Sequence, residues 1–168
     1  MIRLELRTPD EMEDAGRRLA AELRAGDLLV LTGSLGAGKT TFTRGLGAGL
    51  GVRGPVQSPT FVLARTHPSL VDGPPLVHVD AYRLGDAMEL DDLDLDFAHS
   101  VVVVEWGAGL LDGVADSRLD LVIERPTGAA APAGGTDDDL LAEDAAEPRI
   151  LTVTGHGPRW AGTPYAAA

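Results

Sequence analysis

Residues 33–40 (GSLGAGKT) constrain this chain more than any other feature, because they match G-x-x-x-x-G-K-S/T at every defined position. Residues 28–32 before them form a short continuous apolar run, which is typical of a strand buried on both faces. Residues 38–50 predict a helix, since Phe42 and Leu46 recur at four-residue spacing. When a strand, a glycine-rich loop and a helix follow in this order, their backbone amides point into one space of the size of an anion. The sequence therefore predicts a phosphate-binding loop in an α/β fold.

Each part of this loop has a separate expected role. Its glycines let the backbone wrap the phosphates, Lys39 reaches the β and γ phosphates, and the Thr40 hydroxyl coordinates magnesium. Lys39 is the one lysine among 14 cationic residues, and a compact charge on a flexible stem suits a phosphate. We therefore expect ATP and Mg²⁺ as cofactors. The expected nucleotide contacts are Gly33, Ser34, Leu35, Gly36, Ala37, Gly38, Lys39, Thr40 and Thr41.

Two predicted strands end in an acidic residue, and such a loop needs an acid beside its metal. Asp80 follows residues 76–79 (LVHV), which are apolar except for the histidine, and Glu105 follows four consecutive valines. Open α/β sheets bind ligands at the carboxyl ends of their strands, where both acids would lie. One could hold the metal while the other orients water, and the sequence alone leaves that assignment open. Thr60, after a Ser-Pro pair, is a third candidate as a group that responds to the γ phosphate.

The remaining pattern predicts a single α/β domain over residues 1–168. Its 44% of apolar residues suits one hydrophobic core. A helix is expected after the cap Thr8 and Pro9, and a second one at 88–95. Residues 126–148 form an acidic Ala/Gly/Pro/Asp tract, which predicts a disordered insertion, and residues 157–168 predict a loose tail. The other expected strands cover residues 2–6, 61–66, 76–81, 101–104, 119–124 and 149–154.

Charge and composition exclude several classes of function. The net charge of -12 repels a phosphate backbone, so strong direct binding to nucleic acid is not expected. No uncharged apolar run is long enough to span a membrane, and the first ten residues lack the apolar core of a secretory signal. We therefore expect a cytoplasmic protein. The absence of cysteine rules out disulfides and thiol chemistry.

Four short segments together resemble one known family. They are the loop GSLGAGKTT, the SPTF at 58–61, the HVDAYRL at 78–84 and the VEW at 104–106. In this order and spacing they resemble the TsaE family, the ATPase subunit of bacterial tRNA threonylcarbamoyladenosine biosynthesis. The resemblance covers about residues 5–125. It implies a P-loop NTPase fold in which central parallel strands are flanked by antiparallel strands, with helices on both faces.

The resemblance also implies an activity and a set of roles. The family hydrolyses ATP in complex with TsaB and TsaD, slowly alone and faster with these partners, and TsaD transfers the threonylcarbamoyl group to adenosine 37 of tRNAs reading ANN codons. Thr40 and Glu105 match magnesium ligands, Asp80 matches an essential acid and Thr60 matches a switch-like threonine. Ser34 and Ala81 depart from the usual Asp and Leu, and neither residue type is needed to bind phosphate. The insertion at 126–148 obscures which C-terminal residues, Arg149 or Arg159 among them, contact nucleotide.

Other nucleotide-binding proteins give alternative interpretations. A GTPase needs an N-K-x-D motif, and this chain has no asparagine and no lysine besides Lys39. A small-molecule kinase would close an arginine-bearing lid over ATP, and the sequence has no arginine-rich lid segment. A non-catalytic switch would use its ATP-bound state to dock a protein partner. Near the expected site, we expect His78 to have a structural role. Packing in the core would explain Trp106 as well as a role in the site would.

Overall fold

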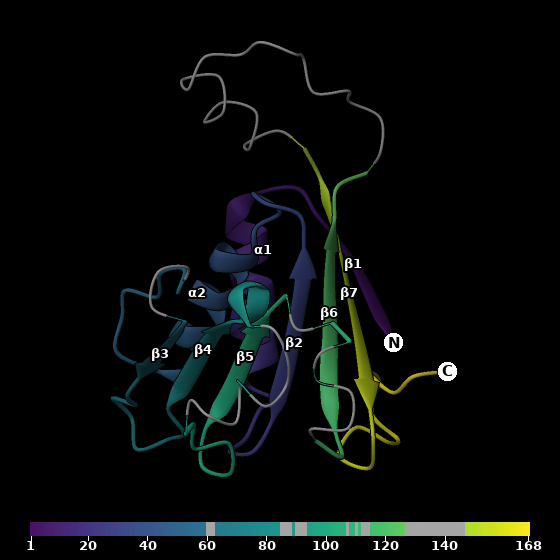
Figure 1. The fold of residues 1–168 in the computed structure, drawn as a ribbon. Helices are drawn as coiled ribbons and strands as arrows, with labels where there is room; N and C mark the ends of the chain where they lie inside the picture. The colour runs from purple at the N-terminus through teal and green to yellow at the C-terminus, as the bar shows by residue number, and fades with distance from the viewer. Residues whose placement is uncertain are drawn as a thin grey trace.

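The computed structural model describes residues 1–59, 63–84, 89, 94–106, 108–109, 111, 115–126 and 147–168. Strands and helices alternate along the first half of the chain, and strands dominate the second half (Figure 1). The elements are β1 (Ile2–Leu6), α1 (Pro9–Ala20), β2 (Leu28–Gly33), α2 (Lys39–Leu50), β3 (Ala64–His67), β4 (Leu76–Asp80), the 3-10 helix η1 (Ala81–Arg83), β5 (Val101–Glu105), β6 (Arg118–Glu124) and β7 (Arg149–His156).

The strands of the described residues form one seven-stranded sheet in the order β1-β7-β6-β2-β5-β4-β3. The four central strands β6, β2, β5 and β4 run parallel to their neighbours among these four. At one edge β7 pairs antiparallel with both β6 and β1, and at the other edge β3 pairs antiparallel with β4. The predicted arrangement of central parallel strands flanked by antiparallel ones is confirmed.

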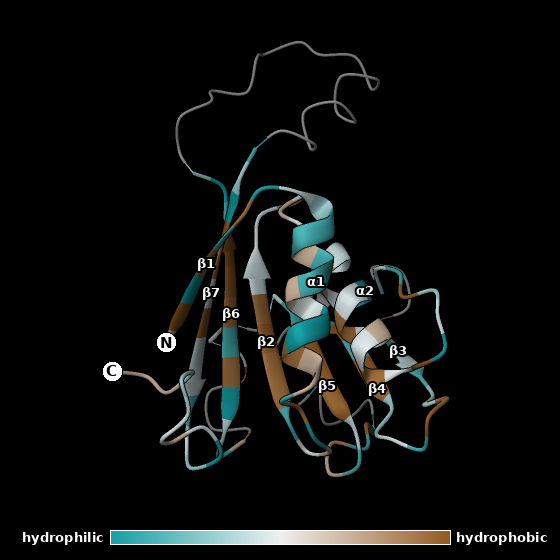
Figure 2. Ribbon diagram, turned by 180° about the vertical axis from the view of Figure 1, so that it is seen from behind, coloured by the Kyte–Doolittle hydropathy of each residue, from teal (hydrophilic) through white to brown (hydrophobic). Residues whose placement is uncertain are grey.

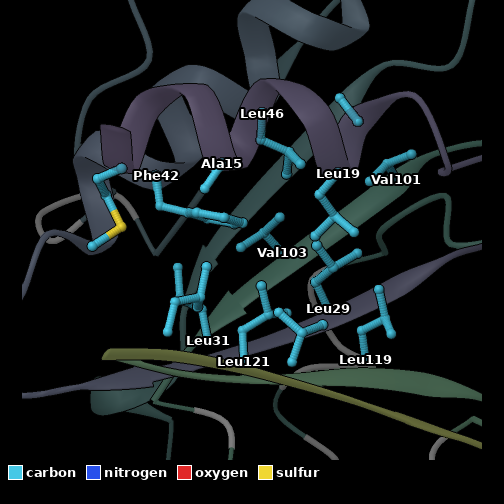
Figure 3. Packing of buried hydrophobic residues seen from close by; sticks show 14 of the residues in the cluster. Ala15, Leu19, Leu29, Leu31, Phe42, Leu46, Val101, Val103, Leu119 and Leu121 are labelled. Carbon is cyan, nitrogen blue, oxygen red and sulfur yellow. The ribbon is translucent and has the colours of Figure 1, made fainter. Parts of the chain in front are cut away.

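Both described α-helices pack on the same face of the sheet, so the described residues do not show the predicted helices on both faces (Figures 1 and 2). Figure 2 shows hydrophobic residues concentrated in the central strands, whereas much of the outer side of α1 is hydrophilic. Between the two layers lies a core in which Phe42 and Leu46 of α2 meet Leu29, Leu31 and Val103 of the sheet (Figure 3). The opposite face has a second buried cluster, built on the alternate residues of β2, β4 and β5. The helix predicted at 88–95 falls largely outside the described residues.

Glycines set the close approach of α1 to α2. A Cβ atom on Gly45 would lie 1.9 Å from the carbonyl oxygen of Glu13, and one on Gly16 would lie 2.2 Å from that of Phe42. These obstacles are backbone atoms, so no rotamer change can relieve them. The helix that carries the phosphate-binding loop is therefore held at a distance from α1 that only glycine at these positions allows.

We expect Gly45→Ala to destabilise the protein by about 3 kcal/mol or more, because overpacking against a rigid backbone forces the helices apart. On propensity alone, alanine in the middle of a helix would stabilise by about 1 kcal/mol, so the sign of the change distinguishes the two effects. Urea unfolding would measure the difference. Gly73→Ala is a matched control, because a Cβ there meets its nearest atom at 3.6 Å. A Gly45→Ala protein as stable as the control would refute this packing argument.

The C-terminal segment 157–168 is packed against the domain, so the prediction of a loose tail is wrong. Trp160 is only 2% exposed and belongs to the main core, where its ring meets that of Tyr165 edge to face. Arg159 forms an ion pair with the buried Asp27, with 3.0 Å between Nε and Oδ1. The segment packs in this way because it buries the ring of Trp160, covers part of that of Tyr165 and supplies the partner of a buried carboxylate.

The predicted disordered insertion lies almost wholly outside the described residues, at 127–146. It connects the end of β6 to the start of β7, which pair with each other in the sheet. The described helices include none that is long and apolar enough to cross a membrane.

Candidate functional site

The loop between β2 and α2 presents backbone amides because of its glycines. Gly36 and Gly38 adopt φ angles of 72° and 106°, a left-handed conformation that residues with a Cβ atom rarely adopt. Gly38 is the N-cap of α2, and no side chain caps the first amides of this helix. Uncapped amides at a helix N-terminus attract an anion. The local structure therefore has the form that a phosphate group requires.

Lys39 is the first residue of α2, directly after the loop. Its side chain is 7% exposed, and its Nζ donates hydrogen bonds to the carbonyl oxygens of Gly33 at 2.9 Å and Ser34 at 3.0 Å. The Nζ atom also lies 4.3 Å from the ring centroid of Trp106, a cation–π contact. Burial lowers the pKa of Lys39, and the nearby carboxylate of Glu105 opposes that shift. The carbonyl oxygens of the loop thus hold the ammonium group of Lys39 beside the space in which a phosphate would bind.

The two candidate acids lie side by side. Strands β4 and β5 are parallel neighbours, and their register pairs Asp80 directly with Glu105. Each of the two residues is 4% exposed. Asp80 Oδ1 accepts a hydrogen bond from the backbone N–H of Tyr82 at 3.0 Å, while Glu105 Oε1 lies 2.9 Å from Nε2 of His78. One oxygen of each carboxylate is therefore engaged by the protein, which leaves the other for a ligand.

These groups converge on one pocket of about 570 Å³, which we call the phosphate pocket. A pocket of this size falls in the range of small-molecule sites. Its lining residues come from the loop, from α2 and from the ends of β4 and β5: Leu35, Gly36, Gly38, Lys39, Thr40, Thr41, Ser58, Asp80, Tyr82, Glu105 and Trp106.

The donors around the phosphate pocket suit a magnesium ion held in part by a nucleotide. Mg²⁺ prefers oxygen ligands and is commonly bound by one or two carboxylates together with substrate phosphates. Within the described ranges, no group of three or more His, Cys, Asp or Glu side chains forms a complete metal cage. The hydroxyl of Thr40 and the carboxylates of Asp80 and Glu105 supply oxygen donors on one side of the pocket. The residues therefore fit a Mg²⁺–nucleotide complex better than a metal alone.

A second, smaller cavity adjoins the same loop on its other side. This side hollow measures about 100 Å³ and shares Gly36, Gly38 and Thr41 with the phosphate pocket. Its further lining comes from the β1–α1 connection, from α1 and from the start of β7: Leu6, Arg7, Thr8, Pro9, Met12, Ala37, Glu147 and Arg149. Sequence reasoning missed all of these except Ala37 and Arg149, because nothing in their local pattern signals a ligand.

The structure brings most of the predicted site residues together. Lys39, Thr40, Asp80 and Glu105 line the phosphate pocket. The other predicted contacts that line it are Leu35, Gly36, Gly38 and Thr41, whereas Ala37 lines the side hollow and Gly33 and Ser34 line neither cavity. Thr60 lies outside the described residues. Arg159, named as a possible nucleotide contact, instead pairs with Asp27. The sequence did not identify His78 as a partner of Glu105 or Trp106 as a partner of Lys39.

Comparisons with known proteins agree on one family. The model of the family described as "Threonylcarbamoyl adenosine biosynthesis protein TsaE" matches residues 6–130. The tRNA threonylcarbamoyladenosine biosynthesis protein TsaE of Streptomyces coelicolor is 58% identical over 153 residues, which cover 89% of this chain and 94% of that protein. The protein of the same name from Bacillus subtilis is 41% identical over 130 residues, covering 74% of this chain and 80% of that protein. A crystal structure of Bacillus subtilis YdiB superposes with a TM-score of 0.62 at 32% identity and covers 94% of this chain and 87% of that one.

Proposed function

This chain belongs to the TsaE family of threonylcarbamoyl adenosine biosynthesis proteins, a family of P-loop ATPases, and from that premise we propose how it works. It is a Mg²⁺-dependent ATPase that acts on a complex of TsaB and TsaD. Its turnover supports formation of the threonylcarbamoyl group on adenosine 37 of tRNAs reading ANN codons. The observation that carries the proposal is the convergence of Lys39, Thr40, Asp80 and Glu105 on one pocket.

ATP binds across the loop, with its phosphates in the phosphate pocket and its nucleoside half toward the side hollow. Three residues of the loop and α2 line both cavities, so a ligand that follows this backbone reaches from one into the other. The uncapped amides of α2 and the ammonium of Lys39 bind the phosphates. In the side hollow, the apolar side chain of Met12 offers a surface for a base.

Thr40 and Glu105 hold Mg²⁺ in this proposal. Held by these residues, Mg²⁺ would supply positive charge against the phosphate oxygens, where negative charge develops in the transition state. Glu105 suits this role because its carboxylate is fixed on one side and lines the phosphate pocket on the other. Thr40 follows Lys39 in α2, so its position is set by the same turn that places the loop amides.

Asp80 orients the attacking water. Its backbone is fixed at the end of β4, and its side chain accepts one hydrogen bond from Tyr82. The water oxygen forms a bond to the γ phosphorus while the bond from that phosphorus to the β–γ bridging oxygen breaks, which yields ADP and inorganic phosphate. Thr60 stays a prediction from the sequence, as a group that responds to the γ phosphate.

Membership of the family and the charge of the chain support the proposed dependence on partners. A protein with a net charge of -12 is repelled by tRNA, which suits an ATPase that works beside a tRNA-modifying enzyme. We expect slow phosphate release by the protein alone and faster release when the cognate TsaB and TsaD are added. The measurement is release of inorganic phosphate with and without Mg²⁺, with Lys39→Ala as the blank.

Two outcomes would contradict this proposal and favour another function. Hydrolysis that stays slow with both partners would contradict their role as activators and favour a nucleotide switch. Transfer of the γ phosphate to an added metabolite, in place of its release to water, would establish a kinase.

A further inference from the structure

We infer that His78 is a positioning residue that holds the Glu105 carboxylate in the orientation needed to bind Mg²⁺. The inference rests on the proposed role of Glu105 as a metal ligand and adds a residue that acts through it. His78 lies on β4, two residues before Asp80, and Glu105 ends the neighbouring strand β5.

The contact between these two side chains is buried. The His78 side chain is 0% exposed, and its Nε2 lies 2.9 Å from Oε1 of Glu105. A carboxylate can only accept a hydrogen bond, so Nε2 of His78 carries the hydrogen and donates it. The other ring nitrogen, Nδ1, has no hydrogen-bond partner in the part of the chain that the structure describes. Among the described residues, the one polar contact of this imidazole is therefore with Glu105.

A purely structural role does not account for a histidine at this position. His78 shares its strand face with the fully buried Leu76 and pairs in register with Val103, so an apolar side chain would fill the space without an unpaired nitrogen. Burying a polar atom without a partner is unfavourable, because the atom loses its hydrogen bonds to water and gains none in return. The imidazole is less favourable than an apolar side chain in this buried position, but it supplies a hydrogen-bond donor to the Glu105 carboxylate.

Asp80 and Glu105 are held in different ways. The backbone N–H of Tyr82 fixes Oδ1 of Asp80, and no substitution except proline at that position removes the donor. A side chain fixes Oε1 of Glu105, and this leaves Oε2 for a ligand in the phosphate pocket. Groups that hydrogen-bond a metal-binding carboxylate typically contribute about 10- to 100-fold to metal affinity or activity. Substitution of His78 can therefore remove the hydrogen bond to Glu105, and a residue with a donor at the same position can restore it.

The test compares His78→Asn with His78→Gln. The amide nitrogen of glutamine reaches about as far as Nε2 of histidine, whereas that of asparagine stops near the position of Nδ1. A fluorescent ATP analogue is titrated against each full-length protein over a series of Mg²⁺ concentrations, and its affinity is also measured in EDTA. The Mg²⁺ concentration at half-maximal enhancement of binding is the readout, and it does not require hydrolysis.

We expect this Mg²⁺ midpoint to rise about 10- to 100-fold in His78→Asn and by less than about 10-fold in His78→Gln, with binding in EDTA unchanged in both. A role in packing alone would change the melting temperature without separating the two variants in their Mg²⁺ midpoints. Equal midpoints in the two variants, or no shift in His78→Asn, would overturn the inference while leaving the proposed ATPase intact. A wild-type protein whose nucleotide binding ignores Mg²⁺ would overturn the metal role of Glu105 and, with it, the inference.

A measurement on the unaltered protein covers the case in which the variants do not fold. Nitrogen-15 NMR of the histidine rings reports which ring nitrogen carries the hydrogen. We expect His78 to be protonated at Nε2, with a hydrogen that exchanges slowly with solvent. A proton found on Nδ1 instead would overturn the inference, because Nε2 could then not donate to Glu105.

Discussion

Glu105→Gln is expected to lower the rate of ATP hydrolysis by about 100- to 1,000-fold, a loss of roughly 3–4 kcal/mol of transition-state stabilisation. Glutamine has nearly the same size as glutamate, so the buried end of β5 keeps its packing. It lacks the negative charge that a magnesium ligand supplies. Binding of ATP in EDTA should persist, because the loop amides and Lys39 remain in place.

Asp80→Asn is expected to cause a loss of similar size by another route. Asparagine keeps an oxygen that can accept the hydrogen bond from Tyr82, so the end of β4 should stay folded. If Asp80 orients water, its substitution lowers turnover at saturating Mg²⁺ without raising the Mg²⁺ concentration needed for half-maximal rate. Glu105→Gln should raise that concentration. The comparison assigns the two acids, which their equal burial does not distinguish.

Steady-state phosphate release over a range of Mg²⁺ concentrations measures both effects. Glu124→Gln is the matched control, because Glu124 is an exposed carboxylate at the end of β6. Full-rate hydrolysis by both Glu105→Gln and Asp80→Asn would show that the candidate site is misassigned. A reversal, in which only Asp80→Asn changes the Mg²⁺ dependence, would exchange the two roles.

The sequence could predict those parts of the site whose geometry depends on residues close together in the chain or on the ends of parallel strands. A buried strand, a glycine-rich loop and a helix follow one another without interruption, so the position of Lys39 depends on local structure alone. Asp80 and Glu105 are far apart in the chain, yet both end apolar strands of the parallel part of the sheet. Parallel neighbours bring their carboxyl ends to the same edge, and the register then places these two residues opposite each other.

Contacts between distant residues could not be predicted in this way. The pairing of Asp27 with Arg159 joins residues 132 positions apart, and no local pattern of small residues and prolines at 157–168 indicates it. Trp160 was the one available signal, since a tryptophan in a polar tail would be exposed unless it packs somewhere. The sequence places His78 on a strand facing opposite to Val77, which predicts a structural role and no partner. Its role toward Glu105 depends on which strand becomes the neighbour of β4.

Lys39→Ala is expected to weaken ATP binding by about 2–5 kcal/mol, which is roughly 30-fold to several thousand-fold in affinity. Lys39 is the one lysine of this chain, so no second lysine side chain can take its place. Burial has already removed much of the water around this charge, so its attraction to phosphate is screened less than that of a surface cation.

The fold should survive this substitution, which makes the loss of binding interpretable. Alanine is a strong helix former and would occupy the first residue of α2. The carbonyl oxygens of Gly33 and Ser34 lose their donor, but the adjoining phosphate pocket admits water that can replace it. Arg44→Ala removes an exposed cation from the same helix and should leave ATP affinity unchanged, as titration with a fluorescent nucleotide would show. If the two variants bound ATP equally well, the phosphates could not lie beside Lys39, and the whole placement of the nucleotide would fail.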